Sequence, residues 1–297
     1  MKRSASKILI EKFFIWLSLV MVIINISCTR LQYRESDNEL RTKFQTIELT
    51  PQISYYRVDS LKAKLRILKL SKPGNKINIV FFHGSPSSIS SWNRYLTDTL
   101  LLNRANLWAI DRPGLGYSKF GKAIPSIKLQ AEIMNAILRD FKLKNIITVG
   151  TSYGGPLAAR LAVLNENVKG VLLISSAMDP SQERQFWGSR LTQWWATRWL
   201  VPRGYRVAGD EKTIHIQELK LLEKEWNKVD VPVIHIHGEI DNIVPFGNVN
   251  YTKLKFKNIK IIPVSGVGHE ISYKKSELVK PLILELIEVV ETQLNYN

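Results

Sequence analysis

One serine of the chain lies in a setting typical of a nucleophile. Ser152 stands between Gly150 and Gly154, after the short apolar run Ile146–Val149 and before residues compatible with a helix. A sharp turn from strand to helix would hold this serine in a strained backbone conformation, with its hydroxyl exposed above a sheet. Glycine two residues to either side lets the strand and the helix approach closely. The pattern therefore predicts a serine able to attack a carbonyl carbon.

Two residues further along the chain could complete this chemistry. A serine hydroxyl is a poor nucleophile without a base, and the base needs a carboxylate to orient it. Asp241 follows the apolar run Val231–Ile236, which places it in the loop at the carboxyl end of that strand. His269 lies in a glycine-flanked loop near the last helical stretch. Ser152, Asp241 and His269 are thus predicted to form a catalytic triad.

Other ionisable residues near Asp241 leave alternatives open. Glu239 and Asp230 are neighbouring carboxylates that could take its place, although Asp230 lies at the wrong end of the predicted strand. His235 and His237 alternate on that strand and face the same way, which suits either two metal ligands or a histidine pair in the core. No cluster of Cys, Asp or Glu in the sequence completes a metal site, so the core pair is favoured and no metal is expected.

The elements that must position these residues alternate between strand and helix. Ala63–Leu70 alternates apolar and basic residues, as a half-exposed strand does, and Ile127–Phe141 carries apolar residues at helical spacing. The short apolar runs predicted as further strands are Ile77–Phe82, Asn106–Ile110, Ile146–Val149, Val171–Ile174 and Val231–Ile236. Such runs suit strands that are buried on both faces of a parallel sheet. The alternation predicts a doubly wound, mostly parallel α/β sheet.

One interval breaks this alternation. Residues 177–229 are rich in tryptophan and arginine and are too numerous for a simple crossover between strands. We predict that they form an inserted, mostly helical cap. The core domain would then comprise residues 51–176 and 230–297.

Five motifs follow one another in the order found in the α/β-hydrolase fold superfamily, which the chain resembles from about residue 50 to its end. They are His83–Pro86 (HGSP), Asp111–Ser118 (DRPGLGYS), Gly150–Gly155 (GTSYGG), His237–Asp241 (HGEID) and Val264–Glu270 (VSGVGHE). The resemblance implies that Ser152 is the nucleophile, His269 the general base and acid, and Asp241 the residue that orients the histidine. It also implies an acyl-enzyme and no metal or organic cofactor. Asp111 and Arg112 are expected only to shape a turn.

The resemblance further implies an oxyanion hole made of two backbone N–H groups. One is assigned to Tyr153 and the other to Ser85, because the following Pro86 has no N–H. A cap covers the pocket in this fold, so cap tryptophans are candidates for substrate contact, with packing alone as the alternative. These candidates are Trp187, Trp194 and Trp195.

The function implied by the resemblance is that of a serine hydrolase. It would cleave an ester, thioester or amide of an apolar small molecule or lipid, and carboxylesterase-like or lipase-like activity ranks first. An aminopeptidase-like enzyme, a C–C bond hydrolase and an acyltransferase of the same fold are alternatives. So is a non-catalytic binding protein tethered to a membrane. The oligomeric state leaves no signal in the sequence.

The amino terminus has the pattern of a targeting segment. Four basic residues within the first twelve precede the apolar run Phe13–Ile24, as in a secretory signal peptide. Cys28, the single cysteine, follows this run and resembles the lipidated cysteine of bacterial lipoproteins. We expect residues 1–27 to be a signal peptide or membrane anchor and residues 28–50 to be a linker. The catalytic body would then lie at the cell envelope, outside the cytoplasm.

The net charge agrees with a membrane partner better than with a nucleic acid. The chain carries 42 Lys and Arg against 26 Asp and Glu, which gives a formal charge of +16. No zinc-finger spacing, RNA-binding aromatic signature or basic arm accompanies this charge, and the basic residues are scattered. A small-molecule or lipid substrate and an anionic membrane face are therefore expected, and nucleic acid is not.

Overall fold

An eight-stranded sheet forms the centre of the molecule. The computed structural model describes residues 11–16, 18–19, 33–45, 49–184 and 188–295. The strands are β1 (Gln52–Val58), β2 (Ala63–Leu70), β3 (Ile77–Phe82), β4 (Ala105–Ile110), β5 (Ile146–Thr151), β6 (Val168–Ile174), β7 (Val233–Gly238) and β8 (Ile259–Val264). Their order is β1-β2-β4-β3-β5-β6-β7-β8. The pairs β1–β2 and β2–β4 are antiparallel and the other pairs are parallel. The predicted doubly wound, mostly parallel sheet is confirmed.

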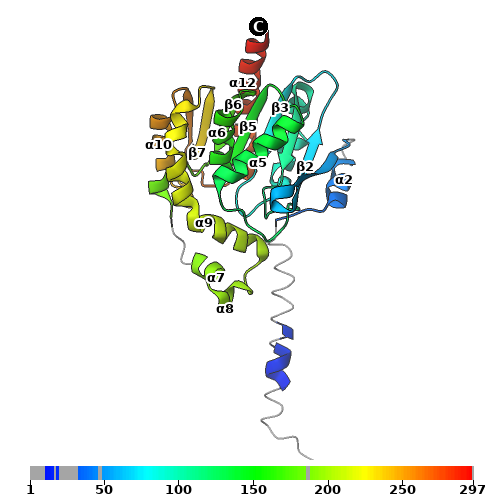
Figure 1. Cartoon of the computed structure of the whole chain (residues 1–297), viewed down its shortest axis with the longest axis vertical. Helices are drawn as coiled ribbons and strands as arrows, with labels where there is room; N and C mark the ends of the chain where they lie inside the picture. Colours follow the sequence, from blue (N-terminus) through cyan, green and yellow to red (C-terminus); the bar gives the residue numbers. More distant parts are fainter. Residues whose placement is uncertain (1–10, 17, 20–32, 46–48, 185–187, 296–297) are drawn as a thin grey trace, which may run out of the picture.

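Helices cover both faces of this sheet (Figure 1). The side chains of β3 alternate between two hydrophobic clusters, because neighbouring residues of a strand point to opposite faces. One cluster includes α5 and α6, and the other includes α2, α3, α4 and α12. These helices are α2 (Asp37–Gln45), α3 (Asn93–Leu96), α4 (Thr99–Arg104), α5 (Ile127–Asp140), α6 (Gly154–Leu164) and α12 (Ser276–Asn295). Shorter helices α10 (Gly247–Lys255) and α11 (Ile271–Lys274) flank β8 in the chain.

The segment between β6 and β7 forms the predicted helical cap. It contains the 3-10 helices η3 (Pro180–Gln182) and η4 (Glu223–Lys228) and the helices α7 (Ser189–Gln193), α8 (Trp195–Arg198) and α9 (Arg203–Leu222). In Figure 1 the helices α7, α8 and α9 lie below one end of the sheet, with α7 and α8 at the tip. The long helix α9 buries Leu219 and Leu222 in the cluster that covers one sheet face. The cap is therefore anchored to the core by its last helix.

Part of the expected linker packs onto the body instead. Residues 37–45 form α2, in which Leu40 and Phe44 are fully buried in the cluster on one face of the sheet. Arg66 of β2, also fully buried, donates hydrogen bonds to the carbonyl oxygen of Glu35 (2.8 Å) and to the carboxylate of Asp37 (3.0 Å). Only two apolar residues of α2 face the core, so its helical period is too weak to stand out among its polar residues. The prediction of a linker over residues 28–50 is corrected for this segment.

The described part of the amino terminus is helical and exposed. Residues 11–16 and 18–19 lie in a helix whose large apolar side chains, from Phe13 to Trp16, are 57–62% exposed. Within the part of the chain that the structure describes, no helix combines the length and the apolar character needed to span a bilayer. Cys28 and most of the segment predicted as a signal peptide lie outside the described residues.

The packing of α2 can be tested by truncating Leu40. Leu40→Ala should lower the free energy of unfolding by about 2–5 kcal/mol, because it leaves a cavity in a fully buried cluster. Leu254→Ala is the matched control, since Leu254 is 84% exposed, and it should change the value by no more than about 0.5 kcal/mol. Urea unfolding measures both. A loss for Leu40→Ala as small as that of the control would show that α2 does not stabilise the body.

Candidate active site

Ser152 lies in a tight turn between β5 and α6. Its backbone is in the left-handed region, with a φ of 53°, and its N–H donates to the carbonyl oxygen of Ile174 in β6 (3.0 Å). A Cβ at Gly154 would collide with the carbonyl oxygen of Phe82, and one at Gly150 would collide with the backbone of Gly154. Close backbone approach thus requires both glycines. The turn has the strained strand–turn–helix geometry expected for residues 150–154.

Asp241 and His269 are hydrogen-bonded to each other. His269 Nδ1 lies 2.8 Å from Asp241 Oδ2. The other oxygen of this buried carboxylate accepts N–H groups of Ile243 (2.9 Å) and Val244 (2.8 Å). Burial raises the pKa of Asp241, but hydrogen bonds from His237 and His269 outweigh it and hold the pKa well below its usual range. Because the ionised carboxylate only accepts, Nδ1 of His269 carries a proton and Nε2 is left to act as a base.

Ser152 and His269 face the same cavity. Both residues line a space of about 690 Å³ at the carboxyl end of the sheet. Among the described residues, no hydrogen bond joins the Ser152 hydroxyl to His269. The hydrogen bond between nucleophile and base is therefore the one interaction of the predicted triad that is not formed in this structure. Catalytic hydrogen bonds often tighten only when substrate binds.

The loop after β3 approaches the nucleophile from the other side. A Cβ built on Gly84 would lie 3.2 Å from Ser152 Cβ and 3.7 Å from its Oγ. His83 fixes this loop, because its Nδ1 donates to the carbonyl oxygen of Gly84 (2.8 Å) and its Nε2 accepts the N–H of Arg112 (2.9 Å). Burial and the charge of Arg112 lower the pKa of His83 well below its usual value, so the ring is neutral. Ser85 therefore lies directly beside the nucleophile turn.

Tyr153, the other residue predicted for the oxyanion hole, stands at the start of α6. It is the residue that precedes the first turn of this helix, where backbone N–H groups lack helical partners. The positive end of the helix dipole lies at the same place. These two features make the N–H of Tyr153 suitable for binding a developing negative charge.

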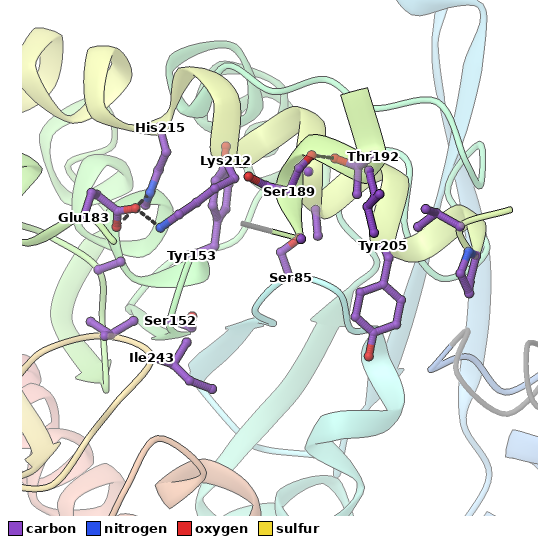
Figure 2. Close-up of a pocket in the computed structure, with 18 residues that line it drawn as sticks. Ser85, Ser152, Tyr153, Glu183, Ser189, Thr192, Tyr205, Lys212, His215 and Ile243 are labelled. Atoms are coloured by element: carbon purple, nitrogen blue, oxygen red, sulfur yellow. Dashed lines mark hydrogen bonds and ion pairs between the residues drawn. The ribbon is translucent and has the colours of Figure 1, made fainter. Parts of the chain in front are cut away.

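Two cavities meet at Ser152. The first has a volume of about 630 Å³ and lies between Ser152 and the cap (Figure 2). Its wall is mostly apolar and includes Leu191, Val201, Pro202, Ala208 and Val244. The second is the cavity of about 690 Å³ that also contains His269, and its wall is rich in hydroxyl and charged side chains. Ser85, Ser152 and Ile243 line both cavities.

Comparison with known proteins agrees with the observed fold. A family model for the alpha/beta hydrolase fold matches residues 77–200. The AB hydrolase superfamily protein YisY of Bacillus subtilis is 22% identical over 245 residues, which cover 70% of this chain and 90% of that protein. The crystal structure of a membrane phospholipase A is 19% identical, with a TM-score of 0.64, and the match covers 96% of this chain and 99% of that chain. An esterase from Exiguobacterium antarcticum is 16% identical, with a TM-score of 0.63, over 80% of this chain and 100% of the other.

The chain has the α/β-hydrolase fold. At these identities the two solved structures share its fold and say nothing of its substrate.

In this α/β-hydrolase-fold protein, Arg112 connects the loop after β3 to the cap. Its buried guanidinium donates to the carbonyl oxygens of His83 (2.9 Å) and Gly84 (3.0 Å). The same group lies 2.6 Å from a carboxylate oxygen of Glu211 in α9, and its Cζ lies 4.4 Å from the centre of the Tyr153 ring. The sequence indicated only a turn at this position. Arg112 is instead a positioning residue that holds both predicted oxyanion-hole loops against the cap.

A charged cluster on the cap forms another part of the first cavity that the sequence did not reveal. Figure 2 shows Lys212 and His215 of α9 directed toward Glu183, above Ser152. His215 Nδ1 lies 3.0 Å from Glu183, Lys212 forms an ion pair with the same carboxylate, and the His215 ring stacks on Tyr153. Burial raises the pKa of Glu183, but the hydrogen bond and charge of His215 and the charge of Lys212 lower it to about 2. The cluster fixes the polar side of an otherwise apolar wall.

The two histidines of β7 form a hydrogen-bonded pair in the core. His237 Nδ1 lies 3.0 Å from His235 Nε2, and His235 Nδ1 lies 2.9 Å from the hydroxyl of Thr252. His237 Nε2 donates to the carbonyl oxygen of Val244 (3.0 Å). In the described part of the chain, no group of three His, Cys, Asp or Glu side chains could hold a metal ion. The pair instead supports the loop that carries Asp241.

The predicted contact between cap tryptophans and substrate is corrected. Trp194 and Trp195 are 56% and 83% exposed, and neither lines the first or the second cavity. Leu191 and Thr192 of α7 face the cavity, so the indoles that follow them lie on the outer side of the cap tip. Trp187 lies outside the described residues.

The charged cap cluster predicts a pH-dependent contribution to stability. Because the folded state holds the Glu183 pKa at about 2, against about 4.3 in an unfolded chain, the ionised form is stabilised above pH 4 and this stabilisation is lost as the pH falls toward 2. Glu183→Gln should therefore lower the free energy of unfolding by up to about 3 kcal/mol near pH 7 and by progressively less below pH 4. Denaturant unfolding from pH 7 to pH 3 measures the difference.

Glu166→Gln removes an exposed carboxylate and is the control for that experiment. A Glu183→Gln effect that stays constant over the pH range would contradict the role given to the ion pair.

Proposed function

We propose that the chain is a serine hydrolase that cleaves an ester of an apolar acyl group through an acyl-enzyme on Ser152. The observation that carries this proposal is the strained turn at Ser152, which faces one cavity together with His269, the residue hydrogen-bonded to Asp241. A nucleophile, a base with a free Nε2 and a buried orienting carboxylate are the groups that acyl transfer to serine requires.

The proposed reaction proceeds in two halves. Ser152 Oγ attacks the carbonyl carbon while its proton passes to His269 Nε2, and the N–H groups of Ser85 and Tyr153 bind the oxyanion. The carbon–oxygen bond to the alcohol then breaks, and His269 gives its proton to the departing oxygen. In the second half a water molecule, deprotonated by His269, attacks the acyl carbon and releases the acid and free Ser152. Asp241 stabilises the imidazolium in both halves.

The chemistry of the first cavity supports an apolar acyl group. Its volume of about 630 Å³ and its mostly aliphatic wall suit a hydrocarbon chain or ring. The solved structures of the esterase and of the membrane phospholipase A have the same fold, which is compatible with a carboxylesterase-like or lipase-like reaction. An aminopeptidase-like reaction is less well supported. Glu183, the carboxylate in this wall that could bind a substrate amino group, is already paired with Lys212 and His215.

The proposed site of action is the cell envelope. The basic and apolar pattern of residues 1–27 and the position of Cys28 support a lipoprotein or a membrane-anchored protein whose catalytic body lies outside the cytoplasm. The charge of +16 is compatible with an anionic membrane face.

Covalent labelling tests the nucleophile. A fluorophosphonate probe should label the full chain, and Ser152→Ala should abolish labelling and lower kcat toward p-nitrophenyl butyrate by about 10⁴-fold or more, because the attacking oxygen is missing. Ser60→Ala, at an exposed serine outside the site, is the control and should be labelled normally.

Two results would refute the proposal. Labelling that persists in Ser152→Ala would place the nucleophile elsewhere, and a folded wild-type chain that is never labelled would favour the non-catalytic binding protein.

A further inference from the structure

The two cavities that meet at Ser152 differ in chemistry. The first, below the cap, is mostly apolar, whereas the second is lined by the hydroxyls of Ser87, Ser90 and Ser91, by Asn93 and by Arg94. Part of the second wall comes from Tyr33, Glu35 and Lys43, which precede β1 and lie outside the segment that matches the family model. The second cavity thus combines residues of the matched segment, from Gly84 to Arg94 and Ser152, with residues that precede it.

The position of the base decides which half of an ester enters each cavity. His269 lines the second cavity and not the first. In the proposed reaction His269 must deliver a proton to the departing alcohol oxygen, so that oxygen lies on the side of the nucleophile that faces His269. The acyl group must then extend to the opposite side, into the apolar cavity below the cap.

The charges in the second cavity indicate what kind of alcohol it suits. Glu35 is paired with Lys43, and Glu270 is paired with Lys274. The guanidinium of Arg94 lies 5.4 Å from the centre of the Tyr273 ring and forms no ion pair with another described residue. Arg94 is the cation best placed to meet an anionic group of a ligand, and guanidinium binds phosphate through paired N–H groups.

Resting on the proposed function, we propose that the second cavity binds the alcohol half of the ester, a hydroxyl-bearing alcohol with a phosphate group that pairs with Arg94. The serine hydroxyls and Asn93 supply donors and acceptors for the alcohol hydroxyls. The acyl chain occupies the cavity below the cap, so the scissile carbonyl lies at Ser85 and Ser152, which line both cavities.

Matched esters test this assignment on the full chain. Octanoyl esters of glycerol 3-phosphate, glycerol and ethanol share one acyl group and differ only in the alcohol. Wild type should show the highest kcat/KM for the phosphate ester. Arg94→Gln should lower that value by about tenfold or more, mainly through KM, and leave ethyl octanoate unchanged, because a charge-assisted pair is lost. Arg139→Gln, at an exposed arginine of α5 far from both cavities in sequence and lining neither, is the control.

The outcomes separate this proposal from the one on which it rests. Equal kcat/KM for the three esters, or an equal fall for all three in Arg94→Gln, would overturn the assignment of the second cavity while fluorophosphonate labelling of Ser152 remained intact. A wild-type chain that the fluorophosphonate does not label would instead overturn the proposed function, and this assignment with it.

The outer surface of the cap carries an independent second inference. Trp194, Trp195 and Trp199 are 56%, 83% and 61% exposed, and Leu200, which follows Trp199, is 49% exposed. Residues 188–206, which contain them, include four arginines and no Asp or Glu. Exposed apolar clusters of this kind are uncommon unless they bind something, and Trp side chains among cations suit the interface of an anionic bilayer.

We infer that this cap tip, formed by α7, α8 and the residues up to 206, docks on an anionic phospholipid bilayer. Arg198 is paired with Asp210 of α9, so the positive charge that such a surface attracts comes from the other arginines of the segment, which contains no acidic residue. The first cavity lies directly behind the tip, since Leu191 and Thr192 of α7 line its wall. Docking would therefore bring the apolar cavity to the lipid surface.

Fluorescence quenching in vesicles tests the docking. Brominated phosphatidylcholine with phosphatidylglycerol should quench part of the tryptophan emission of the full chain, and the quenched part should fall when Trp194, Trp195 and Trp199 are all replaced by Phe. Arg190→Glu combined with Arg203→Glu should also reduce it, because attraction to the anionic lipid is reversed. Quenching of the triple Phe variant equal to that of the wild type would overturn the inference, as would quenching that is independent of anionic lipid.

Discussion

The buried charge of Arg112 determines how the cap sits above the sheet. This guanidinium is held by the carbonyl oxygens of the loop after β3, by the Tyr153 ring and by Glu211 of the cap. Removing one partner from a buried ion pair typically costs about 3–5 kcal/mol, because the remaining charge is left uncompensated. The cavity below the cap is lined in part by residues of α9, so its shape depends on where this helix lies. The contacts of Arg112, together with the burial of Leu219 and Leu222, therefore link the shape of the apolar cavity to the placement of the residues predicted to bind the oxyanion.

The parts of the fold that the sequence predicted are those with strong local signals. Short apolar runs identified β3 and β5, since strands buried on both faces are apolar at most of their positions. The run predicted as Val231–Ile236 became β7 over Val233–Gly238, because Pro232 has no N–H to donate to a strand ladder. Glycines forced by close backbone contact identified the turn at Ser152 in the same way. Each of these signals is carried by neighbouring residues and needs no knowledge of the tertiary structure.

The features that were missed depend on contacts between distant segments. The two buried residues of α2 are too few to show a period, and the direction of Trp194 and Trp195 depends on which side of α7 meets α9. The cluster of Glu183, Lys212 and His215 joins residues about thirty positions apart, none of which has a distinctive motif. The second cavity combines the segment before β1 with loops from both halves of the core. None of these arrangements leaves a pattern in a single stretch of sequence.

Tyr33 forms part of the wall of the second cavity. Its position limits the distance between the catalytic centre and any surface to which the amino terminus is attached. Only five residue steps separate Tyr33 from Cys28. A fully extended chain spans at most about 3.6 Å per residue, so the rim of the cavity lies within about 18 Å of residue 28. If residue 28 is fixed at a lipid surface, this short connection keeps the molecule close to that surface. The opening of the second cavity then stays within reach of the lipid headgroups.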